Sequence, residues 1–263
     1  MYLTWLDSNS WLIELGEGEK TTRILMDPWL VGDLMFGDAK WFFRGFRKQD
    51  RSIPENIDLI LLSQGLEDHA HPATLKALDK SIPIVGSPSA AKVATSLGFT
   101  QVNELKHDRV FTLDGKVKIQ ALEGSTVGPG TKENAYVIKD LVQGTTLYYE
   151  PHGYHSPKLK QIGAIDVVLT PMIDLKLPLV GAFIKGTSSA LELAQWVTPQ
   201  VMLPTAAGGD INFEGLLIKI LKADGGPSQL QEQLIAKALK TRVMEPKPGE
   251  RTAIVLEPLA TAV

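Results

Sequence analysis

A short run that is apolar on both faces, DLILLS at 58–63, constrains the fold most. Such a strand must be covered on each side, whereas a strand with one face in water alternates apolar and polar residues. A helical pattern follows at 71–78, and the order repeats with IPIVGS at 82–87 and a helix at 88–98 that proline starts and glycine ends. These repeated strand–helix units predict an α/β protein with helices outside its sheets.

Further strands and helices are expected on both sides of these units. β-branched, aliphatic or aromatic runs between turn residues predict strands at 2–6, 10–15, 22–27, 109–115, 117–124, 134–140, 144–150, 166–171, 200–206 and 251–257. Apolar residues at helical spacing predict helices at 187–197, 212–223 and 227–240. No low-complexity linker or repeat divides the 263 residues, so we expect one domain over 1–263.

Composition excludes several classes of protein and of site. The net charge is −3 and no basic run is long enough to follow a phosphate backbone, so nucleic acid is not an expected partner. The absence of cysteine excludes disulfides, thiolate zinc sites and iron–sulfur clusters, so any metal must bind through nitrogen and oxygen. No apolar run approaches the ~20 residues of a membrane span, and Asp7 stands where a signal peptide is basic. We therefore expect a cytoplasmic protein without a transmembrane segment.

The histidines gather in two places, each directly after an expected strand. Four of the five histidines lie there with two carboxylates, as Asp68, His69 and His71 after the first strand and Glu150, His152 and His155 after the second. Imidazole and carboxylate are ligands of zinc, iron and manganese, and a catalytic site commonly uses three such ligands. Taken singly, each of these residues is more often solvated or hydrogen-bonded to backbone. Their clustering favours a metal site.

Three segments together resemble a known family. TWLDSNSWLIEL at 4–15, RILMDPWLVG at 23–32 and LILLSQGLEDHAHPATLKAL at 59–78 are similar to segments of the metallo-β-lactamase-fold superfamily. The resemblance is to the branch of small metal-dependent hydrolases that includes ascorbate-phosphate lactonases and phospholipase-D-like phosphodiesterases. It covers nearly the whole chain. It implies a four-layer αββα sandwich with the site at the edge where the strand-end loops converge.

The signature of that superfamily, H-x-H-x-D-H, is degenerate here. Its first two histidines hold the first metal, and their positions carry Gln64 and Leu66. Its last two residues hold the second metal, and they remain as Asp68 and His69. The resemblance therefore implies that half of the signature is lost.

Other positions of the family pattern differ as well. The histidine of the opening loop appears as Ser8, the one expected after VKIQALEG is absent around 125–127, and the late one is replaced near Ala206. The bridging aspartate corresponds approximately to His152. The resemblance thus excludes the standard dinuclear zinc site. It leaves a rebuilt, mononuclear site as the hypothesis.

The expected site binds one divalent ion, with zinc first and manganese or iron as alternatives. The ligand candidates are the four residues Asp68, His69, His71 and His152. A bound ion would polarise an ester, lactone or phosphoryl oxygen and lower the pKa of a water. Glu150 or His155 would then carry the proton. The expected activity is hydrolysis of a small or lipid-like ester, lactone or phosphodiester.

Aromatic and basic residues alternate in KWFFRGFRK at 40–48. The pattern, in an expected exposed loop, suits a lid that binds an apolar anionic substrate through Trp41, Phe42 and Phe43, or a contact with anionic lipid. The alternative is that the aromatic residues pack under the sheet while the basic residues are solvated.

Two other functions remain open at this stage. The lost histidines favour a pseudoenzyme that keeps the fold as a ligand- or partner-binding protein. Acid–base chemistry without a metal, by His69, Glu150 and His155, is a further alternative. Asp68 and His69 are both retained, and this favours an enzyme over a pseudoenzyme.

Overall fold

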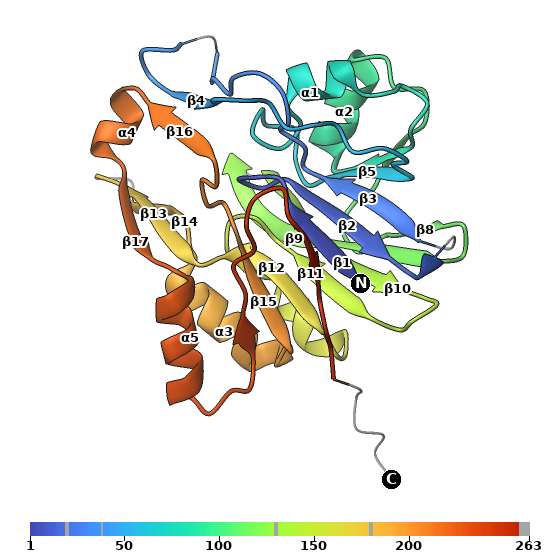
Figure 1. Ribbon diagram of the computed structural model, residues 1–263, viewed down its shortest axis with the longest axis vertical. Helices are drawn as coiled ribbons and strands as arrows, with labels where there is room; N and C mark the ends of the chain where they lie inside the picture. Colours follow the sequence, from blue (N-terminus) through green and yellow to red (C-terminus); the bar gives the residue numbers. More distant parts are fainter. Residues whose placement is uncertain (19–20, 38, 129–130, 179–180, 258–263) are drawn as a thin grey trace.

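Two large mixed sheets lie face to face in the computed structural model, which describes residues 1–18, 21–37, 39–128, 131–178 and 181–257 (Figure 1). The first has the order β19 (Arg251–Ala253), β1 (Tyr2–Trp5), β2 (Trp11–Leu15), β3 (Thr22–Met26), β5 (Leu59–Leu62), β6 (Ile84–Gly86) and β7 (Val102–Glu104). The second has the order β18 (Arg242–Val243), β15 (Val201–Thr205), β12 (Val167–Pro171), β11 (Thr146–Tyr149), β10 (Thr131–Asp140), β9 (Val117–Gly128) and β8 (Val110–Leu113).

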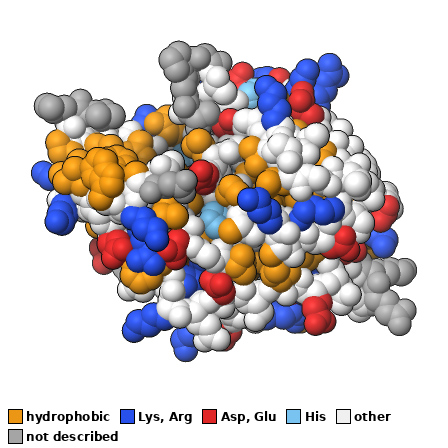
Figure 2. Space-filling view, turned by 90° about the horizontal axis from the view of Figure 1, so that it is seen from above, with side chains coloured by type: hydrophobic (Ala, Val, Ile, Leu, Met, Phe, Trp, Pro, Cys, Tyr) orange, Lys and Arg blue, Asp and Glu red, His pale blue; other side chains and the backbone are white. Residues whose placement is uncertain are grey.

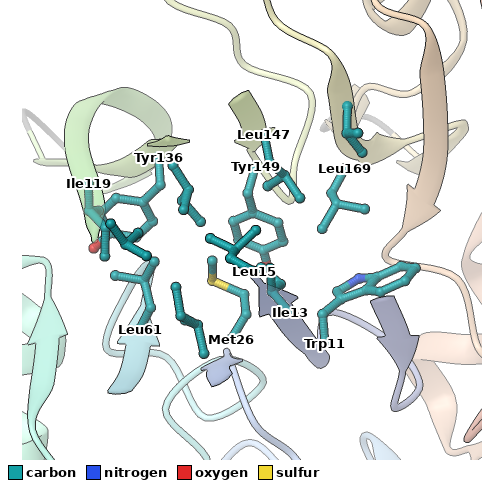
Figure 3. Packing of buried hydrophobic residues seen from close by; sticks show 14 of the residues in the cluster. Trp11, Ile13, Leu15, Met26, Leu61, Ile119, Tyr136, Leu147, Tyr149 and Leu169 are labelled. Carbon is teal, nitrogen blue, oxygen red and sulfur yellow. The ribbon is translucent and has the colours of Figure 1, made fainter. Parts of the chain in front are cut away.

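The inner faces of the two sheets enclose the main core (Figure 3). Successive residues of a strand point to opposite faces, so β2 sends Ile13 into this layer and Leu12 to the outside. Side chains from both sheets meet here, among them Trp11, Ile13, Leu15, Met26 and Leu61 from the first and Ile119, Tyr136, Leu147, Tyr149 and Leu169 from the second. Burial of this apolar surface holds the sheets together.

Helices cover the two outer faces. On the first sheet, α1 (Pro72–Ala77) and α2 (Pro88–Ser96) pack over the outward side chains of its strands. On the second, α3 (Thr187–Val197) and α5 (Pro227–Ala236) do the same, beside the short 3₁₀ helix η2 (Pro157–Gln161). This arrangement confirms the four-layer αββα sandwich expected from the sequence. No helix in the described ranges is long and apolar enough to cross a lipid bilayer.

Two small sheets lie beside the sandwich. One pairs β4 (Arg44–Arg47) with β16 (Ile211–Glu214), and the other has the order β14 (Gly181–Ile184), β13 (Ile173–Leu177), β17 (Lys222–Gly225). The helix α4 (Leu216–Ile220) connects them.

The prediction of one helix at 212–223 is wrong, because this segment forms a strand, a short helix and another strand. Its helical spacing is interrupted at Gly215, which has a φ of +113° and approaches the carbonyl oxygen of Phe42 so closely that a Cβ there would lie 2.5 Å away. The residues before this glycine instead form β16, which pairs antiparallel with β4. The paired residues Glu214 and Arg44 are 170 positions apart in the chain. The expected exposed loop at 40–48 contains that strand.

A buried carboxylate attaches the β4–β16 pair to the first sheet. Asp7 is 0% exposed and accepts hydrogen bonds from Arg47 Nε at 2.6 Å, Arg51 Nε at 2.8 Å and the backbone N–H of Asp210 at 2.9 Å. Burial alone would raise the pKa of Asp7, but hydrogen bonds from Arg51 and Arg47 lower it. Gly209 packs so close to this carboxylate that a Cβ would collide with it. The arrangement depends on the charge of Asp7.

We expect Asp7→Asn to lower the free energy of unfolding by about 3 kcal/mol, because it leaves the buried Arg47 guanidinium without a counter-charge. Urea unfolding followed by circular dichroism measures the loss. The control is Asp108→Asn, which breaks a half-exposed pair with Lys158 and should cost less than about 1 kcal/mol. Equal losses in the two variants would contradict this role for Asp7.

Candidate functional site

The loops that carry the predicted site residues meet at one edge of the sandwich. The parallel pairs β3–β5 and β11–β12 end there, so Asp27 follows β3, Gln64 follows β5 and Glu150 follows β11. The rings of His69 and His152, on loops that follow strands of different sheets, have centroids 5.0 Å apart. Figure 2 shows a histidine side chain at the surface between hydrophobic side chains. Because both groups of histidines follow strands that end at this edge, His69 from one group and His152 from the other lie close together.

Asp27 fixes the orientation of His69. Its Oδ2 accepts from His69 Nδ1 at 2.7 Å, from the Tyr149 hydroxyl at 2.6 Å and from Ser63 Oγ at 2.5 Å. Its Oδ1 accepts from the backbone N–H of Ser63 at 2.7 Å. Because Nδ1 is used in this way, Nε2 points to the opposite side of the ring, where Asp68 Oδ2 lies 3.1 Å away.

Three of the predicted metal ligands form a compact group. Asp68, His69 and His152 each offer one ligand atom, and these atoms lie within 4.8 Å of one another. Two nearby buried oxygens, Asp68 Oδ1 and Gln64 Oε1, have no hydrogen-bond partner among the described residues. Carboxylate and imidazole donors beside unpartnered buried acceptors are what a zinc, iron or manganese ion requires. The donor set therefore fits a divalent ion.

Charge coupling sets the protonation of this group. Burial alone would lower the pKa of His69, but the charges of Asp68 and Asp27 outweigh it and raise the pKa to about 10. Burial would raise the pKa of Asp68, and the His69 charge instead lowers it to about 2. Burial and the His69 charge lower the pKa of His152 to about 3. At neutral pH, His69 is charged and His152 is neutral.

Glu150 shapes the loop that carries His152. Its Oε2 accepts from the backbone N–H of His152 at 3.0 Å, of Tyr154 at 2.8 Å and of Gly153. Its Oε1 is buried and has no partner within the part of the chain that the structure describes. Burial raises the pKa of Glu150 to about 7, although the three backbone hydrogen bonds oppose this shift. A carboxyl group with this pKa can both accept and donate a proton at neutral pH.

The structure does not bring His71 and His155 into the group. His71 precedes α1 as its N-cap, and its Nε2 donates to the carbonyl oxygen of Asp33 at 3.1 Å. His155 Nδ1 accepts from the hydroxyl of Tyr148 at 3.2 Å, and Tyr148 packs in the core under α3, on the outer side of the second sheet. Burial lowers the pKa of both histidines, that of His155 to about 3.

The predicted aromatic substrate residues have different environments. Trp41 is 73% exposed, Phe42 is half-buried and Phe43 is only 8% exposed. The ring of Phe43 packs on Phe36 with centroids 5.1 Å apart and on Phe213 with centroids 6.0 Å apart. Phe43 is therefore a core residue of the β4–β16 region, while Trp41 is open to solvent.

The sequence patterns do not single out Asp27 or Asn9. Asn9 Nδ2 lies 3.3 Å from His69 Nε2, and Asn9 Oδ1 accepts from the Thr205 hydroxyl at 3.1 Å and from the backbone N–H of Ala206 at 3.0 Å. The position of Asp27, directly after the strand that precedes the Asp68 loop in the sheet, was a signal that could have found it. Asn9 gave no signal beyond its place beside Ser8.

Comparison with known proteins agrees with this architecture. The chain is 24% identical to a UPF0173 metal-dependent hydrolase of Roseiflexus sp. (strain RS-1), over 94% of this chain and 95% of the relative. A possible metal-dependent hydrolase from Veillonella parvula has a similar structure, with a TM-score of 0.69, 15% identity and coverage of 97% of this chain and 99% of that one. An isothiocyanate hydrolase from Delia radicum gut bacteria has a TM-score of 0.68, 17% identity and the same coverage.

The family assignment comes from the sequence itself. The family model described as the beta-lactamase superfamily domain matches residues 2–206, which include all three segments that carried the resemblance. The match also includes Asp27, Asp68, His69 and His152. The chain belongs to the beta-lactamase superfamily.

Proposed function

We propose that the protein is a metal-dependent hydrolase that uses one divalent ion. The observation that carries the proposal is the convergence of Asp68, His69 and His152, with Asp27 behind His69. A carboxylate that accepts from the outer nitrogen of a ligand histidine is the usual support of a metal-bound imidazole. The similarity to a relative named as a metal-dependent hydrolase supports the same function. We also propose that residues 1–263 act as one domain.

The donor set favours zinc, and manganese or iron would also accept it. When bound, such an ion supplies Lewis acidity toward an ester, lactone or phosphoryl oxygen and lowers the pKa of a water. Asp27 keeps His69 Nδ1 occupied, so only Nε2 is available to the ion. Glu150 carries the proton at Oε1, because its Oε2 is engaged by the His152 loop. The proposed substrates are small or lipid-like esters, lactones and phosphodiesters.

A binding protein without a metal is the second candidate, and one observation favours it. His69 Nε2 already contacts Asp68 Oδ2 at 3.1 Å and Asn9 Nδ2 at 3.3 Å. A charged imidazole between Asp27 and Asp68 forms an ion pair with each carboxylate without an added cation. The metal content of the protein distinguishes this candidate from the hydrolase.

We expect protein purified without a histidine tag or chelator to contain about one divalent ion per chain. Asp68→Ala and His152→Ala should each lose it, because each removes one of three ligands, while the circular dichroism spectrum stays native. Elemental analysis by mass spectrometry measures the content, and His107→Ala, which changes a histidine bonded to the Glu133 carbonyl, is the matched control. Wild-type protein that remains metal-free after incubation with zinc, manganese or iron would refute the hydrolase.

Metal uptake should release one proton per ion between about pH 5 and pH 6, below the pKa of about 7 that a metal-bound water can reach. The pKa of His69 is raised to about 10, so its Nε2 must lose a proton to bind, whereas the pKa of His152, about 3, leaves that ring already neutral. Affinity should therefore rise about tenfold per pH unit in this range. Titration calorimetry in buffers of different ionisation enthalpy counts the protons. A count of zero or two would contradict the assignment of charge in the site.

We expect Glu150→Gln to lower kcat about 100-fold or more without loss of the ion. Glutamine keeps an oxygen to accept the backbone N–H groups of the His152 loop but cannot transfer a proton. The substrates are chromogenic esters, lactones and phosphodiesters, and metal content is measured on the same samples. His155→Gln decides between the two proton carriers that the sequence suggested. A loss of kcat in that variant alone would contradict the role of Glu150.

A further inference from the structure

Large hydrophobic side chains are exposed together over α4, β16 and the segment before β4. They are Phe36 at 37%, Trp41 at 73%, Phe213 at 39%, Leu216 at 48% and Ile220 at 44% exposure, and we refer to them as the apolar patch. Figure 2 shows hydrophobic side chains gathered on the side of the molecule where Figure 1 places α4 and β16. Exposed apolar surface that is contiguous marks an interaction site in soluble proteins.

Local structure holds these side chains at the surface. The backbone N–H of Leu216 donates to the carbonyl oxygen of Trp41 at 3.0 Å, so the tryptophan lies at the start of α4. Leu216 and Ile220 are one helical turn apart and therefore share a face. The helix has four apolar residues in five, and none of its residues is buried. Leu217 and Ile218 pack against the small core of the β4–β16 region, but this packing does not account for the exposed Leu216 and Ile220.

The border of the apolar patch is positively charged. Lys40 adjoins Trp41, Lys219 lies on α4 and Lys222 follows it on β17. All three are exposed, and none has an ion-pair partner among the described residues. The neighbouring carboxylates of Glu214 and Asp224 already pair with other basic side chains. The patch therefore combines apolar surface with cationic groups that have no counter-charge within the part of the chain that the structure describes.

We propose that the apolar patch docks the protein on the surface of an anionic lipid bilayer. A tryptophan and aliphatic residues bordered by lysines suit the boundary between headgroups and acyl chains, where the lysines meet lipid phosphates. A second copy of the same patch is a poorer occupant, because a symmetric contact would bring the unpaired lysines of the two copies together. The expected cytoplasmic location agrees, since the cytoplasmic leaflet carries anionic lipid.

Docking needs neither the metal nor hydrolysis, so it stands or fails separately from the proposed function. The test is sedimentation with vesicles of phosphatidylcholine alone or mixed with phosphatidylserine. We expect binding to the mixed vesicles, a shift of tryptophan emission to shorter wavelength as Trp41 leaves water, and weakening by salt. Leu216→Ser/Ile220→Ser should bind at least about tenfold more weakly. Lys219→Ser/Lys222→Ser should lose about fivefold per lysine at low salt.

Matched controls make the same chemical changes on α5 and the residues after it. Ile235→Ser removes a hydrophobic side chain that is 67% exposed, and Lys237→Ser/Lys240→Ser removes two exposed lysines. Both variants should bind as the wild type does. Equal binding to neutral vesicles, equal loss in the controls, or no binding at all would overturn the proposal. So would a dimer in light scattering that Leu216→Ser/Ile220→Ser dissociates without any vesicle binding by the wild type.

Discussion

The buried carboxylate of Asp27 is the interaction on which the site depends, because it joins the two sheets and directs His69. It receives Ser63 from the end of β5 in the first sheet and the hydroxyl of Tyr149 from β11 in the second. Four hydrogen bonds offset the cost of removing this charge from water. The same contacts leave His69 with one free direction, toward Asp68. Sheet packing and the geometry of the candidate metal centre therefore share one carboxylate.

The resemblance to the superfamily implies that its metal-binding signature is altered at this site. Gln64, where the signature has its first histidine, is 0% exposed and donates from Nε2 to His152 Nδ1 at 3.4 Å. Gln64 therefore donates to the His152 ring, whereas Asp27 accepts from the His69 ring. The resemblance implies that only the second-metal residues of the signature, Asp68 and His69, remain, which is why we propose one ion and not two. The apolar patch lies on elements outside the two large sheets, and it includes none of the three candidate metal ligands.

The sequence predicted the layers well and one peripheral region poorly. The strand at 58–63 is apolar on both faces because helices cover one face and the inner core covers the other. Its unbroken apolar run is enough to predict this burial. The spacing at 212–223 also looks helical, but pairing with β4 and the close approach at Gly215 decide its structure. Such contacts are not encoded in local periodicity. Strand-end position correctly brought Asp68 and His152 together but could not show that His71 is used as a helix cap.

X-ray absorption spectroscopy of the protein loaded with one equivalent of zinc tests whether Asp68, His69 and His152 hold the ion. We expect two imidazole nitrogens and carboxylate oxygen around the ion, with one imidazole lost in His152→Ala and no metal–metal scattering. Zinc surrounded only by water oxygens, or an unchanged spectrum in His152→Ala, would contradict the assignment of Asp68, His69 and His152 as the metal centre.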